Sequence, residues 1–324
     1  MDPLKLNQIS DTRIFVSSLG VGGAPFGHNY KWSQGSEVSA DTVSKTISKA
    51  IKYGLNYFDT APGYGYGQSE RYYGNCLPNF NRSKFVISSK VGNLIYHDDK
   101  LSSLNSKKDY SKDGIFRSVE ESLNRLKLDY LDIALVHDPD EHMQLALEES
   151  FPALLDLKSQ GVVRSVGAGM NYCEPLIDFA NKVDLDCFLV AGRYTLLDQS
   201  AAQELFPICL EKNISLILGG PYNSGILASD LSKSVTYDYL PAPEHLIDKA
   251  KAIKLICNEH SVDIKAAALQ FPLAHSSVVS VIPGVTSIDQ VNENITMLKT
   301  DIPNSLWEHL KATELIHPDA PTPN

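Results

Sequence analysis

Short apolar runs alternate with longer amphipathic segments along most of the chain. In each longer segment apolar residues recur every three or four positions, which is typical of a helix with one buried face. The order of apolar run and amphipathic segment repeats through the sequence and indicates parallel strands covered by helices, rather than a β-sandwich. We predict strands at 17–21, 56–59, 85–88, 132–136, 163–167, 186–190, 215–218 and 278–282.

The helices between these strands have start and stop signals at several of their ends. Gly54 and Gly161 follow predicted helices, where glycine is a common C-terminal stop. Asp113, and either Thr286 or Ser287, precede helices and are suitable N-terminal caps. We predict helices at 39–53, 68–77, 114–126, 147–160, 174–181, 199–212, 244–259 and 288–297, with an extra helix at 263–271.

The pattern predicts a single (β/α)8 TIM barrel with an N-terminal β-hairpin. The hairpin is formed by LNQIS and TRIFV around Asp11 and is expected to close the bottom of the barrel. Since no proline- or serine-rich linker divides the chain, we expect one domain over 1–317 with long loops at 91–113 and 219–243. The proline-rich residues 318–324 are predicted to form a flexible tail.

Charge and cysteine content narrow the class of partner. The 324 residues include 29 Lys and Arg against 39 Asp and Glu, a net charge of -10, without a basic tract that would favour nucleic acid. The five cysteines form no CxxC pair, which fits a reducing cytosol and indicates neither a zinc site nor a disulfide framework. No apolar run approaches the roughly 18 residues of a membrane span. We therefore expect a cytoplasmic protein with a small-molecule substrate, whose oligomeric state the sequence does not indicate.

Four residues form the candidate catalytic site. Asp59, Lys90 and His137 each end a predicted strand, in YFD, FVISSK and LDIALVH, and Tyr64 follows Asp59 by five positions. In an eight-stranded barrel every parallel strand delivers its C-terminal end to the same face, where active sites of this fold lie. Singly, such an aspartate is more often a turn residue and such a tyrosine a packing residue. Together the four groups indicate one site.

The chemistry of the four groups suits hydride transfer to or from an oxygen-bearing carbon. Such a reaction needs a group that takes or gives the hydroxyl proton. Tyr64 is the candidate, and because a free tyrosine has a pKa of about 10, a neighbouring cation would make it a better base. Lys90 supplies that charge, Asp59 holds Lys90, and His137 orients the substrate oxygen.

At these positions the chain resembles the aldo-keto reductase superfamily, which has the same Asp, Tyr, Lys, His tetrad. The motifs FDTAPGYG and ALVHDPD around Asp59, Tyr64 and His137 match as well. The resemblance implies a (β/α)8 barrel that binds a nicotinamide cofactor without a Rossmann domain, and the chain has no GxGxxG motif. The segments SVGAGMN at 165–171 and LVAGRYTLLDQ at 189–199 resemble the sugar 1-dehydrogenase branch of the superfamily.

The resemblance also implies contacts to the nicotinamide and pyrophosphate of the cofactor. Superfamily members usually have Ser-Asn after the fifth strand, where this chain has Gly169 and Met170, and Asn171 is expected to take over the contact to the nicotinamide amide. GGPYNSGIL at 219–227 resembles the loop over the pyrophosphate, where small residues let backbone amides approach an anion. Its candidate residues are Gly219, Gly220, Pro221, Asn223 and Gly225.

IPGVTSIDQVNEN at 282–294 resembles the adenosine-binding segment. Members that prefer NADPH commonly have a lysine directly after the proline and an arginine seven residues after it, where this chain has Gly284 and Gln290. A 2′-phosphate without those cations would be poorly stabilised, so NAD is the expected cofactor and NADP the less favoured one. Glu293 and Asn294 match the pair that contacts adenine.

The expected reaction is NAD-dependent oxidation of an aldose, of the L-fucose, L-galactose or D-arabinose type, at the anomeric carbon to the lactone. Asp138, Tyr30 and Trp32 are candidate substrate contacts. The first alternatives are a pyridoxal 4-dehydrogenase and a general NADPH-linked carbonyl reductase. A non-catalytic nucleotide-binding regulatory barrel is a third, against which the complete tetrad argues. A metal-dependent sugar isomerase comes last, because the strand ends offer few metal ligands and no metal is predicted.

Overall fold

The computed structural model describes residues 1–27, 38–99, 103–231 and 235–323. Its centre is an eight-stranded parallel sheet in the order β14-β11-β10-β9-β8-β5-β4-β3. Isolated parallel bridges from Leu19 to Val281 and from Gly22 to Gly284 bring the two edges together, so the sheet is nearly closed into a barrel. The strands are β3 (Val21–Gly22), β4 (Tyr57–Asp59), β5 (Val86–Val91), β8 (Leu131–His137), β9 (Val163–Met170), β10 (Cys187–Ala191), β11 (Ser215–Gly219) and β14 (Val278–Ile282).

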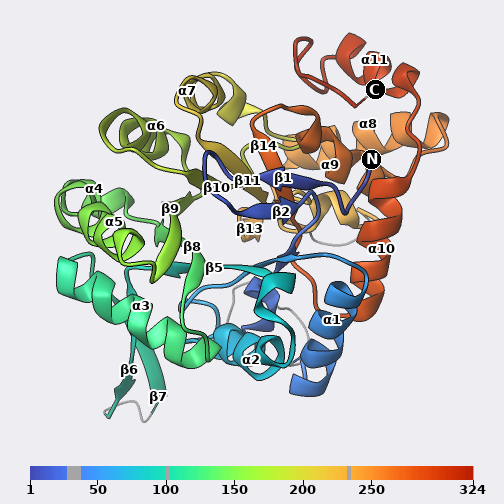
Figure 1. Cartoon of the computed structure of the whole chain (residues 1–324). Coiled ribbons are helices and arrows are strands. Elements are labelled where there is room, and N and C mark those ends of the chain that lie inside the picture. The colour runs from blue at the N-terminus through green and yellow to red at the C-terminus, as the bar shows by residue number, and fades with distance from the viewer. Residues whose placement is uncertain (28–37, 100–102, 232–234, 324) are drawn as a thin grey trace.

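Helices surround this barrel and confirm the (β/α)8 prediction (Figure 1). Gly54 and Gly161 follow α1 and α5 with φ angles of 93° and 78°, as expected of stop glycines. The Ser287 side chain caps α10, whereas α3 is capped by Ser111 and not by Asp113. The helices are α1 (Ala40–Lys52), α2 (Gln68–Cys76), α3 (Lys112–Leu126), α4 (Met143–Leu145), α5 (Phe151–Ser159), α6 (Cys173–Lys182), α7 (Leu205–Glu211), α8 (Glu244–Glu259), α9 (Ile264–Gln270), α10 (Ile288–Lys299) and α11 (Asn304–Ala312).

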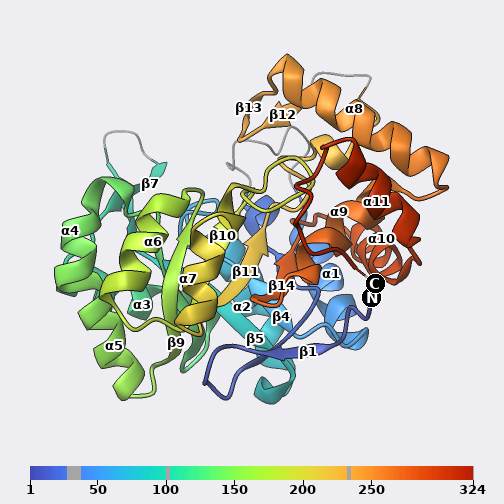
Figure 2. The same cartoon turned by 90° about the horizontal axis from the view of Figure 1, so that it is seen from above.

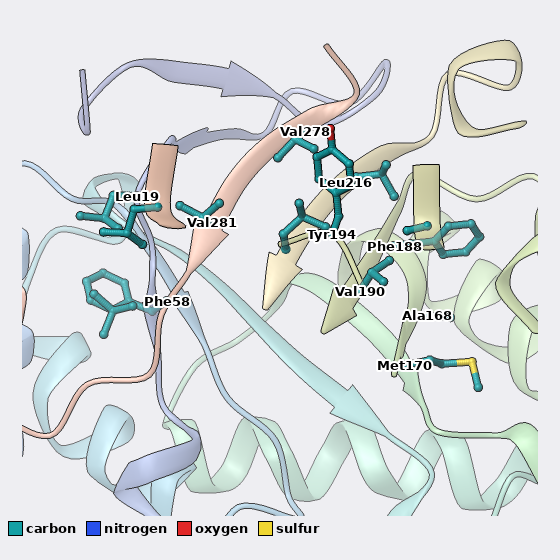
Figure 3. Packing of buried hydrophobic residues seen from close by; sticks show 14 of the residues in the cluster. Leu19, Phe58, Ala168, Met170, Phe188, Val190, Tyr194, Leu216, Val278 and Val281 are labelled. Carbon is teal, nitrogen blue, oxygen red and sulfur yellow. The ribbon is translucent and has the colours of Figure 1, made fainter. Parts of the chain in front are cut away.

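Two apolar clusters share the strands. Residues that face outward, such as Phe58, Ala168 and Val281, join the large cluster between sheet and helices, part of which is shown in Figure 3. Other strand residues, such as Tyr57 and Ile282, face the barrel interior and form a smaller cluster. Successive side chains of a strand point to opposite faces, and the two clusters follow that alternation.

The predicted N-terminal hairpin is present and belongs to the interior cluster. β1 (Leu6–Gln8) pairs antiparallel with β2 (Phe15–Ser17). Ile9, Ile14 and Val16 are buried in the interior cluster together with residues of the barrel strands. The hairpin therefore closes the barrel at the end opposite to the β6–β7 and β12–β13 hairpins, as Figure 2 shows.

The two segments expected as long loops contain short antiparallel pairs. In 91–113, β6 (Asn93–Asp98) pairs with β7 (Ser103–Lys108), and in 219–243, β12 (Thr236–Tyr237) pairs with β13 (Leu240–Pro241). Most side chains of β6 and β7 are at least partly exposed. Exposed hairpins need little apolar alternation, so the sequence pattern did not show them.

Several element boundaries also differ from the sequence predictions. A first barrel strand was expected at 17–21, but β2 ends at Ser17 and β3 is only Val21–Gly22. β9 continues to Met170, through glycines that weaken the strand signal. The predicted helix at 199–212 is a 3-10 turn at Ser200–Ala202 followed by α7, and the predicted helix at 147–160 begins with a π turn at Ala146–Ser150. α11 was not predicted.

The C-terminal segment lies against the protein as far as it is described. Ala320 is buried and belongs to the large apolar cluster. The division into one domain over 1–317 and a flexible tail at 318–324 stays a prediction. In the described part of the chain, helices fall short of the length and apolar character needed to span a membrane.

Candidate active site

Strand alternation places three of the four predicted catalytic residues at the barrel mouth. Tyr57 and Leu135 belong to the interior cluster, and Asp59 and His137 follow them by two positions in β4 and β8. Asp59 and His137 therefore face the interior as well, one layer nearer the C-terminal face. Lys90 in β5 is 2 % exposed, and its ammonium meets the Asp59 carboxylate inside the barrel.

The Lys90 ammonium is held by a closed set of oxygen acceptors. Its Nζ lies 2.9 Å and 2.8 Å from the two carboxylate oxygens of Asp59 and donates to the Thr60 carbonyl oxygen at 3.0 Å. Ser88 Oγ donates to Asp59 Oδ1 at 2.7 Å. A buried charge is tolerated only when paired and hydrogen-bonded, and this pair meets that requirement. Sequence reasoning missed Ser88 and Thr60.

Tyr64 lies between the lysine and the histidine. The Lys90 ammonium is 4.7 Å from the centre of the Tyr64 ring, and the rings of Tyr64 and His137 make a T-shaped contact at 6.1 Å. The Tyr64 loop leaves no space at Gly27, where a Cβ atom would lie 2.3 Å from the carbonyl carbon of Tyr64. Gly27 thus permits the close backbone approach that fixes this loop.

His137 is held as a neutral imidazole at the rim of the site. Burial lowers the pKa of its side chain, although nearby Asp138 acts in the opposite direction. Asn93 Nδ2 lies 3.4 Å from His137 Nδ1, and Tyr110 donates its hydroxyl to the His137 carbonyl oxygen at 2.6 Å. With Nδ1 as the acceptor, the ring hydrogen is on Nε2, which can donate to a substrate oxygen.

The Asn93 contact gives a testable prediction. Replacing Asn93 by leucine removes a hydrogen bond of about 1 kcal/mol, so we expect kcat/KM to fall about fivefold. Asn93→Asp should lower kcat/KM further, since a carboxylate favours the hydrogen on Nδ1 and raises the histidine pKa. The low-pH limit of activity should then move upward, measured as a kcat/KM profile against pH. Equal profiles for wild type and both variants would contradict this role.

Most predicted cofactor contacts line one cavity of about 260 Å³ beside the barrel mouth. It is formed by the ends of β9, β10 and β14, the loop after β11, and helices α9 and α10. Segments far apart in sequence therefore meet as the resemblance implied. The predicted residues in its wall are Asn171, Gly220, Pro221, Asn223, Gly225, Gly284, Gln290, Glu293 and Asn294.

The other predicted contacts lie at strand ends. Gly169 is within β9, and a Cβ atom there would be 3.5 Å from Lys90 Cε. Gly219 ends β11 opposite Ala191 and is outside the wall of the cavity. Asp138 follows His137, with Oδ2 3.7 Å from His137 Nε2. Tyr30 and Trp32 lie outside the described residues.

The loop after β11 lines the cavity with two glycines of positive φ and a buried amide side chain. Gly220 and Gly225 have φ angles of 60° and 94°, which glycine adopts without strain. Asn223 donates from Nδ2 to the Gly192 carbonyl oxygen at 3.2 Å, while its buried Oδ1 accepts no hydrogen bond from the described residues. A buried acceptor in a cavity wall needs a partner, and a ligand N–H or O–H fits it. This acceptor is compatible with a hydroxyl or amide of the nicotinamide cofactor that the sequence analysis expects here.

The Arg193 side chain holds two parts of the cavity wall together, the end of β9 and the loop after β11. It donates to the Asn171 carbonyl oxygen at 2.7 Å and to Asp198 at 3.0 Å, and it pairs with Asp238 of the loop that lines the cavity. Sequence reasoning missed Arg193, although its position in LVAGRYTLLDQ was a signal. Among the described residues no three His, Cys, Asp or Glu side chains form a group that could hold a metal ion.

Comparison with known proteins decides the family. The sequence model of the aldo/keto reductase family matches residues 18–314. The chain belongs to this family. It is an NAD(P)-dependent oxidoreductase acting on CH–OH groups, and the resemblance seen in the tetrad motifs is confirmed.

Three known proteins illustrate the relationship of this aldo-keto reductase to others. It is 35% identical to D-threo-aldose 1-dehydrogenase of Pseudomonas sp, over 95% of this chain and 96% of that protein. It is 34% identical to pyridoxal 4-dehydrogenase of Microbacterium luteolum, over 94% and 96%. The holo form of an aldo-keto reductase from Bacillus halodurans superposes with a TM-score of 0.79 at 25% identity, covering 96% of each chain.

Proposed function

We propose that this aldo-keto reductase oxidises an aldose at its anomeric carbon with NAD and forms the lactone. The observation that carries the proposal is the cluster of Tyr64, Lys90, Asp59 and His137 at one barrel mouth, beside the cavity suited to a dinucleotide. The similarity to D-threo-aldose 1-dehydrogenase supports the substrate class.

The residues divide the reaction between them. Lys90, held by Asp59, places a positive charge near the Tyr64 ring and favours the phenolate form, which takes the proton of the anomeric hydroxyl. His137 donates from Nε2 to the substrate oxygen and keeps it in line with Tyr64. A nicotinamide cofactor held by the cavity residues would supply the hydride acceptor, and loss of hydride and proton would convert the anomeric carbon to the lactone carbonyl.

The choice of NAD rests on the adenosine end of the cavity. Gly284 and Gln290 line this end and carry no charge, at the positions where NADPH-preferring members have cations. A doubly charged 2′-phosphate would lack partners there, whereas a ribose hydroxyl needs only neutral hydrogen bonds. For the sugar, Asp138 is the nearest carboxylate to the tetrad histidine and a partner for a sugar hydroxyl.

Pyridoxal oxidation is the second candidate, because a pyridoxal 4-dehydrogenase is 34% identical over almost the whole chain. The same Tyr64 would take a hydroxyl proton and the same His137 would orient the oxygen. A general carbonyl reductase would use these residues in the opposite direction and would prefer NADPH.

The test is the initial rate of absorbance change of the cofactor with L-fucose, L-galactose, D-arabinose and pyridoxal, each with NAD and with NADP. We expect fast turnover of at least one of the sugars with NAD. The Tyr64→Phe protein, purified in the same way, controls for contaminating dehydrogenases. Reduction of aldehydes with NADPH, together with no oxidation of any aldose with NAD, would refute the proposal.

A further inference from the structure

A lysine that the sequence analysis did not consider lies in the wall of the dinucleotide cavity. Lys265, on α9, lines the cavity together with Gln290 and Glu293 of α10. Its ammonium forms an ion pair with Glu293 and lies 3.9 Å from Asp263 Oδ2. The side chain of Lys265 is 22% exposed and that of Glu293 is 41% exposed, so both are partly removed from water.

The positive charge of Lys265 is balanced by a carboxylate in the same wall. Among the described residues that line the cavity, Asp238 and Glu293 are acidic and Lys265 is basic. Asp238 is paired with Arg193, and Lys265 is paired with Glu293. A second anion placed near Lys265 would therefore compete with a carboxylate of this chain, and would be repelled by it.

Gln290 is oriented to offer a neutral donor in the same wall. Its Oε1 accepts from the Thr286 backbone N–H at 2.6 Å and from the Thr286 hydroxyl at 3.1 Å. A backbone N–H can only donate, so this contact fixes the amide and places Nε2 as its donor end. An amide donor can bind a ribose hydroxyl but supplies no charge to a phosphate.

We propose that the Glu293–Lys265 pair determines the choice between NAD and NADP. Lys265 is the one basic residue in the described cavity wall, and its ion pair with Glu293 keeps it from binding a 2′-phosphate. A free 2′-hydroxyl needs no cation and can bind the Gln290 amide. The inference rests on the proposed function in that it assigns this cavity to the adenosine half of the cofactor. It adds the residue pair that makes the pocket selective.

The experiment measures the dissociation constants of NAD and NADP by isothermal titration calorimetry, without substrate. In Glu293→Gln the lysine is released and can donate a charge-assisted hydrogen bond to the 2′-phosphate. We therefore expect the affinity for NADP to rise about tenfold relative to that for NAD. The ratio of the two constants is the readout, because loss of an adenine contact from Glu293 would weaken both cofactors alike. Lys265→Met added to Glu293→Gln should abolish the tighter binding of NADP. Asp248→Asn changes the net charge by the same amount in a surface pair on α8 and should alter neither constant.

The outcomes separate this inference from the proposed function. An unchanged ratio of NADP to NAD affinity in Glu293→Gln, or a raised ratio that persists in the double variant, overturns the role of the pair even if the wild type oxidises sugars with NAD. A wild type that binds NADP as tightly as NAD overturns it as well. A tenfold increase in NADP affinity that depends on Lys265, in a protein that oxidises none of the sugars, supports the pair and refutes only the substrate.

Discussion

Tyr64→Phe is expected to reduce kcat by about 10²- to 10⁴-fold, the usual contribution of general acid–base catalysis. The substitution removes only the phenol oxygen. Its ring still fills the space between Lys90 and His137, and the loop held by Gly27 keeps its backbone path. Since Tyr64 is not in the wall of the cavity proposed for the cofactor, the dissociation constant of NAD should change by less than about twofold.

Tyr66→Phe is the matched control, because Tyr66 belongs to the same glycine-rich loop and is outside the tetrad. Both variants are compared by initial rates with saturating sugar and by calorimetric titration with NAD. Similar losses of kcat in the two variants would indicate a damaged loop rather than a missing base. Loss of NAD binding in Tyr64→Phe would assign the residue to the cofactor, and wild-type kcat would remove it from the mechanism.

The four catalytic candidates could be predicted from the sequence because three of them end strands, and strand periodicity sets which way their side chains point. Asp59, Lys90 and His137 end strands whose apolar runs are visible in the sequence, and parallel strands of a barrel share one C-terminal face. The structure adds what periodicity does not encode. Ser88, two positions before Lys90, looked like a small strand residue and in fact donates to the Asp59 carboxylate.

Contacts that cross between distant loops could not be predicted from one sequence. Asn93 meets His137 at the start of β6, where β6 pairs with β7, and such exposed strand pairs leave little hydrophobic pattern. The sequence analysis did not consider Lys265, because its pairing with Glu293 depends on how α9 packs against α10. Such placements depend on packing of loops and helices, on which local residue preferences carry no information.

Arg125→Met is expected to lower the free energy of unfolding by about 3–5 kcal/mol, because it leaves a buried carboxylate without its partner. Glu70 of α2 is fully buried, and its Oε2 accepts from Arg125 Nε of α3 at 2.6 Å. Its other oxygen accepts from Ser89, the residue before Lys90 in β5, at 2.7 Å. The pair therefore joins α2 and α3 to the strand that carries the catalytic lysine. Without the guanidinium, the Glu70 carboxylate would stay buried as an unpaired charge, which lowers the stability of the folded state.

Urea denaturation followed by fluorescence measures this loss as a lower midpoint at an unchanged slope. Lys45→Met is the control, since the Lys45–Asp41 pair is exposed at 64%/71% and should contribute less than about 1 kcal/mol. Replacing Glu70 by leucine together with Arg125→Met should recover part of the stability, because no unpaired charge is then buried. If Arg125→Met were as harmless as Lys45→Met, the carboxylate would have to be satisfied by other groups, and the connection between α2, α3 and the catalytic lysine would not depend on this ion pair.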